Sequence, residues 1–105
     1  MIKDLRSRDS LRGDMLVKYF ATYRNITRRR TEEVAAPATI LALLQRLSDT
    51  YGAELRSWLL SPDGTQKGDN AIIMVNGRHI EHLQGVDTPL KEDDTVSLFP
   101  LVAGG

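Results

Sequence analysis

The sequence predicts an α+β domain in which one long helix packs on a mixed β-sheet. Residues 40–51 place aliphatic side chains at helical spacing. Residues 15–23, 71–75 and 95–99 are short runs of β-branched, aromatic and aliphatic residues separated by polar turns, as strands are. The helix has a single apolar stripe, and that stripe needs a sheet to cover it. We therefore expect a domain of two layers, with the helix in one layer and the sheet in the other.

The first half of the chain predicts a hairpin. Residues 1–14 have few apolar side chains among many charged ones, so we expect a flexible extension or a short docked helix ahead of a domain at residues 15–101. Side chains in residues 15–23 alternate between two faces, which predicts the first strand. The polar run 24–30 breaks this pattern, and residues 31–37 return as a second strand that ends at a proline.

The main helix is predicted over residues 40–51. Thr39 stands where an N-cap is needed, and Gly52 follows as a stop signal. The apolar stripe is formed by Ile40, Leu43, Leu44, Leu47 and Tyr51. A second short helix is expected in residues 53–60, where Trp58 has a packing role, before a turn rich in proline and glycine.

The second half of the chain predicts the rest of the sheet. Residues 71–75 form a strong strand candidate, and the dipeptide Asn76-Gly77 is suited to a tight hairpin that leads into residues 78–80. A polar connection then crosses back to a final strand at residues 95–99. The order strand, strand, helix, strand, strand, strand is that of a β-grasp fold.

Composition sets limits on function. The 105 residues suffice for one domain, and 14 basic against 14 acidic residues offer no broad attraction to nucleic acid or anionic lipid. The absence of cysteine removes disulfides, thiolate metal sites and a cysteine nucleophile. No stretch has the length of a membrane span and the N-terminus lacks the apolar core of a secretory signal, so we expect a cytoplasmic protein.

Two polar clusters have simple interpretations as surface. His79 and His82 lie three residues apart, but a strand-to-loop position with no companion cysteine is poor for ligation, so we expect no metal site. The run Arg28-Arg29-Arg30 could bind phosphate or RNA, yet Glu32 and Glu33 follow at once and a solvated turn explains it. We find no phosphate-binding glycine loop and no nucleophile-base-acid set.

The end of the chain is its most informative feature. Gly104 and Gly105 follow an apolar run directly. A backbone without side chains can thread a narrow channel and place its terminal carboxylate beside the reactive group of another protein. A short disordered end without a role is the plain alternative. The sequence favours chemistry on the terminus.

The residues before this tail are the expected partner surface. If Val96 and Leu98 face the core, alternation puts Phe99 on the other face, and Pro100 should end the strand pairing because it has no N–H to donate. Phe99 and Leu101 are then docking candidates, and a place in the core is the alternative for both. The predicted partner-binding set is Phe99, Pro100, Leu101 and Val102.

Three segments carry a family resemblance. They are residues 75–77 (Val-Asn-Gly), residues 90–96 (Leu-Lys-Glu-Asp-Asp-Thr-Val) and the ending 98–105 (Leu-Phe-Pro-Leu-Val-Ala-Gly-Gly). Together they resemble the MoaD/ThiS family of ubiquitin-like sulfur carriers, over residues 15–105. The Phe-Pro-x-Val-Ala-Gly-Gly ending is most similar to the small subunit of molybdopterin synthase. Leu101 departs from that pattern, which often has a second proline there.

The resemblance implies a carrier that is not itself an enzyme and holds no cofactor. An ATP-dependent adenylating enzyme, similar to ubiquitin-activating enzymes, would activate the carboxylate of Gly105, because a carboxylate becomes a good electrophile once AMP can leave. A sulfur donor would then produce a thiocarboxylate at Gly105, with Gly104 and Ala103 in the tail of residues 102–105. In the molybdopterin case, the large subunit of the synthase would receive this sulfur for a cyclic pyranopterin precursor. Nucleic acid and membrane are not expected partners.

Two alternatives use the same terminus. The sulfur could go to another product, such as thiamin thiazole, thiolated tRNA or an amino acid. The protein could also be a modifier whose Gly105 forms an isopeptide bond with target lysines. A structural module with an inert tail is the residual possibility. Fold alone does not separate these functions, because one scaffold serves many.

Overall fold

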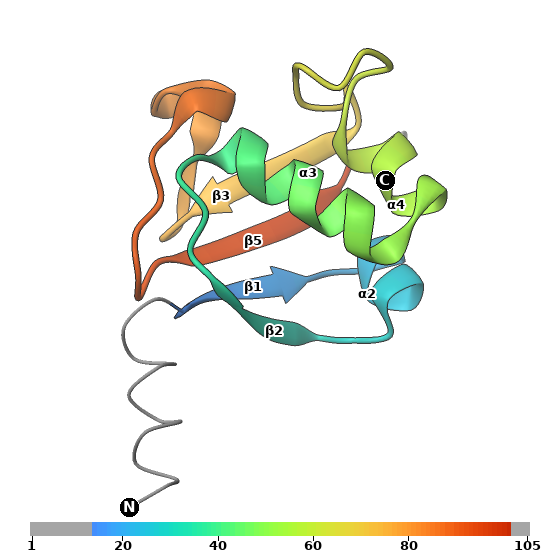
Figure 1. Ribbon diagram of the computed structural model, residues 1–105, viewed down its shortest axis with the longest axis horizontal. Helices are drawn as coiled ribbons and strands as arrows, with labels where there is room; N and C mark the ends of the chain where they lie inside the picture. Colours follow the sequence, from blue (N-terminus) through green and yellow to red (C-terminus); the bar gives the residue numbers. More distant parts are fainter. Residues whose placement is uncertain (1–13, 102–105) are drawn as a thin grey trace, which may run out of the picture.

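The computed structural model describes residues 14–101. It shows a five-stranded sheet with helices packed on one face (Figure 1). The strands are β1 (Asp14–Tyr19), β2 (Thr31–Ala35), β3 (Ala71–Val75), β4 (Arg78–His79) and β5 (Thr95–Pro100). The helices are α2 (Thr22–Thr27), α3 (Ile40–Tyr51) and α4 (Ala53–Leu59), with 3₁₀ turns η1 (Ile80–His82) and η2 (Gly85–Asp87). The predicted α+β class and β-grasp architecture are confirmed.

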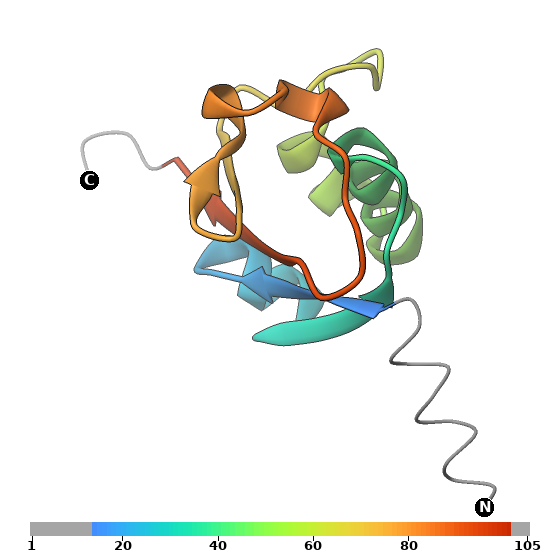
Figure 2. The ribbon, with the colours of Figure 1, turned by 90° about the vertical axis from the view of Figure 1, so that its left-hand side faces the viewer.

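The sheet is mixed, in the order β2-β1-β5-β3-β4. Its two central strands, β1 and β5, run parallel, with Val17 opposite Val96. β2 and β3 flank them in antiparallel pairings. Parallel neighbours need a long crossover, and the chain between β1 and β5 supplies it. Figure 2 shows α3 and α4 stacked on one side of the sheet, which leaves the opposite face open.

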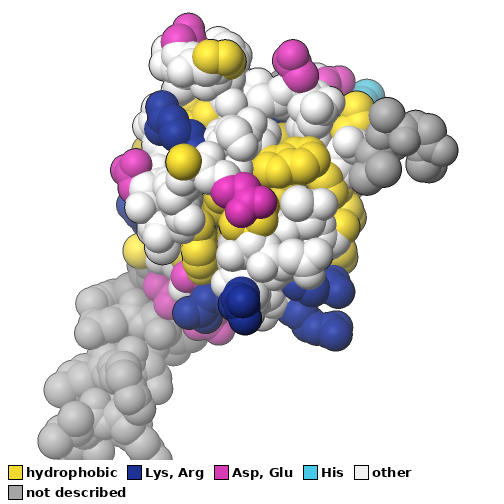
Figure 3. Space-filling view, turned by 90° about the vertical axis from the view of Figure 1, so that its right-hand side faces the viewer, with side chains coloured by type: hydrophobic (Ala, Val, Ile, Leu, Met, Phe, Trp, Pro, Cys, Tyr) yellow, Lys and Arg dark blue, Asp and Glu magenta, His cyan; other side chains and the backbone are white. Residues whose placement is uncertain are grey.

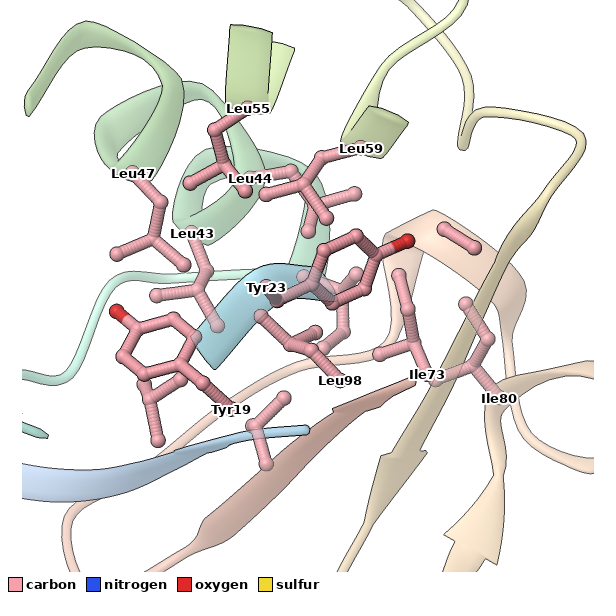
Figure 4. Close-up of a cluster of buried hydrophobic side chains, with 14 of the residues drawn as sticks. Tyr19, Tyr23, Leu43, Leu44, Leu47, Leu55, Leu59, Ile73, Ile80 and Leu98 are labelled. Atoms are coloured by element: carbon pink, nitrogen blue, oxygen red, sulfur yellow. The ribbon is translucent and has the colours of Figure 1, made fainter. Parts of the chain in front are cut away.

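The core lies between α3, α4 and the inner face of the sheet (Figure 4). Thr39 caps α3 as predicted, because its Oγ1 accepts the N–H of Ala42 over 3.2 Å. In the predicted stripe, Ile40 and the three leucines are buried and Tyr51 is half-buried. Trp58 also packs as expected, with its ring edge-on to Tyr23 at 5.6 Å. Within residues 14–101, no helix is long and apolar enough to cross a membrane.

The first strand is shorter than predicted, because residues 22–27 form the helix α2. Ala21 has a positive φ of 52°, which turns the chain out of the sheet after Phe20. Tyr23 and Thr27 are both buried and lie four residues apart, so they share the inner face of this helix. The side chains of this segment fit both the alternation of a strand and the spacing of a helix. The segment forms a helix because this buries Tyr23.

Two other predicted boundaries need correction. β2 ends at Ala35, two residues before the proline. The strand after Asn76-Gly77 ends at His79, because Ile80 begins the turn η1 and is buried there. The predicted polar crossing before β5 contains the 3₁₀ turn η2. Each correction concerns a place where tertiary contacts outweigh local preference.

Glu32 joins three elements at the edge of the sheet. Its Oε1 accepts the hydroxyl of Tyr19 over 2.8 Å and the hydroxyl of Tyr51 over 2.6 Å. Burial, together with the Glu32 charge and hydrogen bond, raises the pKa of Tyr19 far above its usual range. The carboxylate of Glu32 therefore faces the helix layer, and it ties β2 to β1 and to α3.

Candidate functional site

The candidate site is the end of β5, because this strand leads into the C-terminal residues. β5 lies between β1 and β3 in the centre of the sheet, so its course is set from both sides. Val96 and Leu98 are fully buried under the helices, as predicted, while Ser97 and Phe99 are half-buried on the open face. A central strand is a rigid element on which to place a functional site.

Phe99 forms a stacked aromatic pair with Phe20 on the open face. The ring centroids lie 4.3 Å apart and the ring planes differ by 9°. The pair forms because β1 and β5 are parallel neighbours, and the N–H of Phe20 donates to the carbonyl of Leu98 over 3.2 Å. Phe99 is therefore outside the helix-covered core, and Phe20 covers part of its surface. The predicted interface role of Phe99 stays a prediction.

Phe20 was not expected at this site. The sequence offered a signal, because Phe20 shares the outward face of the predicted first strand. Its pairing with Phe99 depends on two distant strands becoming neighbours. The guanidinium carbon of Arg24 lies 6.0 Å from the Phe20 ring centroid, at cation–π distance. The aromatic pair consequently has a positive charge at one side.

The strand pairing of β5 ends at Pro100, as predicted, and one further backbone hydrogen bond follows it. Pro100 is the last residue of β5 and stands opposite Ala71, and the N–H of Leu101 donates to the carbonyl of Asn70 over 2.7 Å. Antiparallel partners bond at alternate residues, so the proline nitrogen faces the other side, where β1 has already ended. A missing N–H therefore costs nothing at this position.

Leu101 is exposed and lies at the base of the tail. With 52% of its surface accessible, it is the large apolar side chain that residues 14–101 present most openly to solvent. Its backbone is held by Asn70, so the side chain projects from a fixed point. The other predicted site residues, Val102, Ala103, Gly104 and Gly105, lie outside the described residues. Leu101 and Phe99 thus remain the described candidates for partner docking.

Two of the resemblance segments, residues 75–77 and 90–96, meet at the opposite end of β5. Asn76 and Asp94 are hydrogen-bonded there, and the backbone N–H of Lys91 donates to Asp94 over 2.9 Å. Asp94 is only 4% exposed, so its carboxylate is buried within this turn and not solvated. These segments position the start of β5 and lie away from the tail.

The remaining polar clusters stay outside the candidate site. The rings of His79 and His82 lie 6.3 Å apart, and Nδ1 of His79 accepts the N–H of Glu81 over 3.2 Å. Among residues 14–101, no three histidine or acidic side chains come together in a way that could hold a metal ion. The run Arg28-Arg29-Arg30 is exposed at the turn between α2 and β2, at the end of the sheet where the tail begins.

Comparison with known proteins extends these observations. The ThiS family profile matches residues 17–105. Small archaeal modifier protein 3 of Haloferax volcanii is 33% identical over 94 residues, covering 88% of this chain and 99% of that protein. The solved structure of small archaeal modifier protein 1 from Methanosarcina acetivorans has a TM-score of 0.75 and 27% identity, over 89% of this chain and 97% of its own. A candidate molybdopterin converting factor subunit 1 from Pyrococcus furiosus has a TM-score of 0.67 and 26% identity, over 86% and 99%.

Proposed function

The chain belongs to the ThiS family of ubiquitin-like sulfur carriers and modifiers, and on this premise we propose that it carries sulfur on the carboxylate of Gly105. A carboxylate oxygen attacks the α-phosphate of ATP on an adenylating partner and expels pyrophosphate. Sulfide from a donor then attacks the acyl carbon and AMP leaves, which produces the thiocarboxylate. Gly104 and Ala103 supply the narrow approach, because they have little or no side chain to clash with a channel.

The observation that carries this proposal is the fixed base of the tail. Phe99 and Leu101 are held by Phe20 and Asn70, and four residues follow Leu101 in the sequence. Extended, four residues reach about 13 Å, enough to enter a partner's active site from a docked domain. The carrier itself needs no catalytic side chain for this chemistry. Activation is left to the partner enzyme.

We assign the sulfur to molybdopterin biosynthesis, with this chain as the small subunit of molybdopterin synthase. The ending Phe99-Pro100-x-Val102-Ala103-Gly104-Gly105 supports this assignment, and so does the similarity to the Pyrococcus furiosus protein. The thiocarboxylate sulfur would act as a nucleophile toward a cyclic pyranopterin precursor in the large subunit. A carrier for another sulfur-containing product would use the same first steps.

A second candidate function is protein modification. The similarity to the Haloferax volcanii modifier protein favours it, since that match spans 88% of this chain. In this case a lysine amine attacks the activated carbonyl of Gly105, AMP leaves and an isopeptide bond forms. The two functions share adenylation and differ in the final nucleophile. Their products therefore distinguish them.

The test is intact mass spectrometry after incubation with ATP, a sulfide donor and the adenylating enzyme of this family from the same organism. A mass change equal to replacement of one oxygen by sulfur is expected, and it should map to Gly105. Adding the large synthase subunit and the pyranopterin precursor should consume the thiocarboxylate. Lysine-linked adducts in lysate, without sulfur transfer to the precursor, would favour the modifier instead.

The matched controls change only the terminus. Removal of Gly105, or addition of residues after it, should abolish the mass change, because the reacting carboxylate is then absent or displaced. Both variants should keep the melting temperature of the wild type, because β5 ends at Pro100. Unchanged thiocarboxylate formation in either variant would contradict the proposal.

A further inference from the structure

Four arginines gather beside the tail end of the sheet. With Asn25 they line a shallow hollow of about 490 Å³ between α2 and β2. We call Arg24, Arg28, Arg29 and Arg30 the arginine corner. In Figure 3, which faces this end of the molecule, Lys and Arg side chains gather along the lower edge and apolar side chains lie above them. The whole chain has no net charge, so this is a local concentration.

The nearby acidic residue Glu32 forms no described ion pair with the arginines of this corner. Its Oε1 accepts from the hydroxyls of Tyr19 and Tyr51, on the helix side of the sheet. Within residues 14–101, the described ion pair is Lys91 with Asp94, and no guanidinium of the corner has a described carboxylate at bonding distance. Arg24 Nε is buried and has no hydrogen-bond acceptor among the described residues. The exposed side chains of Arg28, Arg29 and Arg30 can therefore offer donors and charge to an outside partner.

The corner and the candidate site belong to one continuous surface. The carbonyl of Arg30 accepts the N–H of Tyr19 over 2.8 Å, and Tyr19 stands level with Leu98 in the next strand. β2 and β5 lie on either side of β1, so they are about 10 Å apart. Arg24 extends the surface to the Phe20 ring. A protein that covers Phe99 would also reach the arginines.

We propose that the arginine corner docks a carboxylate-lined rim on the adenylating enzyme, next to the apolar contact made by Phe99 and Leu101. This inference rests on the proposed function. A protein partner suits an apolar centre flanked by charge, whereas the zero net charge of the chain disfavours a polyanion such as RNA. Arginine binds carboxylates with two parallel hydrogen bonds. It also stays protonated, so it is not acylated by the activated tail nearby.

The experiment measures ATP–pyrophosphate exchange by the adenylating enzyme as a function of carrier concentration. The variant R28A/R30A should raise KM for the carrier about five- to tenfold with kcat unchanged, as expected for the loss of two partly exposed ion pairs. The difference should shrink toward 1 M salt, where charges are screened within about 3 Å. Melting curves should match the wild type, because both side chains are exposed.

The control variant is R78E. It changes the net charge by two, as R28A/R30A does, but Arg78 pairs with Val75 at the end of the sheet remote from the tail. Its KM should equal that of the wild type. Equal KM values for R28A/R30A and R78E would overturn this inference while leaving sulfur carriage intact. If R28A/R30A lost binding to transfer RNA without a change in KM, the partner of the arginine corner would be RNA and not the adenylating enzyme. Failure of wild-type exchange would overturn the proposed function itself.

Discussion

The side-chain amide of Asn76 donates a hydrogen bond to Oδ1 of Asp94 over 2.9 Å, and Asn76 Oδ1 accepts the N–H of Thr95 over 2.9 Å. The β3–β4 turn is thereby attached to the first residues of β5. Asn76 and Gly77 both have positive φ, 51° and 83°, as a tight hairpin turn requires. The asparagine serves the turn and the strand start together. The start of β5, and with it the path of the tail, depends on this pair.

Asp94 should contribute stability that acid removes. Burial raises the pKa of Asp94, but the hydrogen bonds from Asn76 and Lys91 and the Lys91 charge outweigh it and hold the pKa below the usual 3.8. The contribution is thus complete above pH 3.8 and is lost as the pH falls through the lower, folded-state pKa. Asp94→Asn should cost about 2 kcal/mol at pH 7 in urea unfolding. The difference in the free energy of unfolding between this variant and the wild type should become smaller as the pH is lowered. The exposed Asp69→Asn is the control, and an equal loss there would contradict the assignment.

Tyr19 and Tyr23 should respond differently to removal of their hydroxyls. Tyr19→Phe loses the donor to Glu32, so it should destabilise by about 1 kcal/mol. The Tyr23 hydroxyl is buried without a hydrogen-bond partner among the described residues, so Tyr23→Phe should be neutral or stabilising. Thermal unfolding of the two variants checks this. A greater loss for Tyr23→Phe would indicate that its hydroxyl has an acceptor.

Replacing Leu101 should weaken binding to the partner with little effect on stability. Because 52% of its surface is exposed, Leu101→Ala should change the free energy of unfolding by less than about 0.5 kcal/mol. The same variant should weaken binding to the adenylating enzyme several-fold, measured by titration calorimetry. Phe99→Ala should weaken binding too, but should also cost about 1 kcal/mol of stability because it loses the Phe20 stack. If Leu101→Ala bound the adenylating enzyme with the affinity of the wild type, Leu101 would not be part of the docking surface.

Gly68 should not tolerate a side chain. A Cβ at this position would lie 2.2 Å from the carbonyl oxygen of Trp58, and the N–H of Gly68 donates to the carbonyl of Leu59 over 2.9 Å. Gly68→Ala should therefore destabilise by about 2 kcal/mol or more, since the end of α4 must shift. Gly77→Ala is the comparison, because only its positive φ is strained and its surroundings are open. It should cost about 1 kcal/mol. Equal melting temperatures for wild type and Gly68→Ala would contradict the close approach.

Most element types could be predicted because their signals are local. The stripe on α3 has a helical period and a capping threonine, and Asn76-Gly77 encodes its turn through positive φ. The prediction failed for residues 22–27, where both periods fit and the burial of Tyr23 decides. It also missed Phe20 as part of the site. That residue acquires its role only when β1 pairs with β5.

The sequence by itself determined the order of the strands and of the main helix, the inward side of β5 and the small residues at positions 103–105, because each follows from neighbouring residues. Tertiary structure decided that Phe20 covers Phe99, that Asp94 is buried, and that Glu32 accepts hydrogen bonds from Tyr19 and Tyr51. These relationships join residues far apart in the chain, and only folding of the whole sheet brings their strands together. Local patterns specify which side chains share one face of a strand or helix, whereas long-range packing specifies which residues that face contacts.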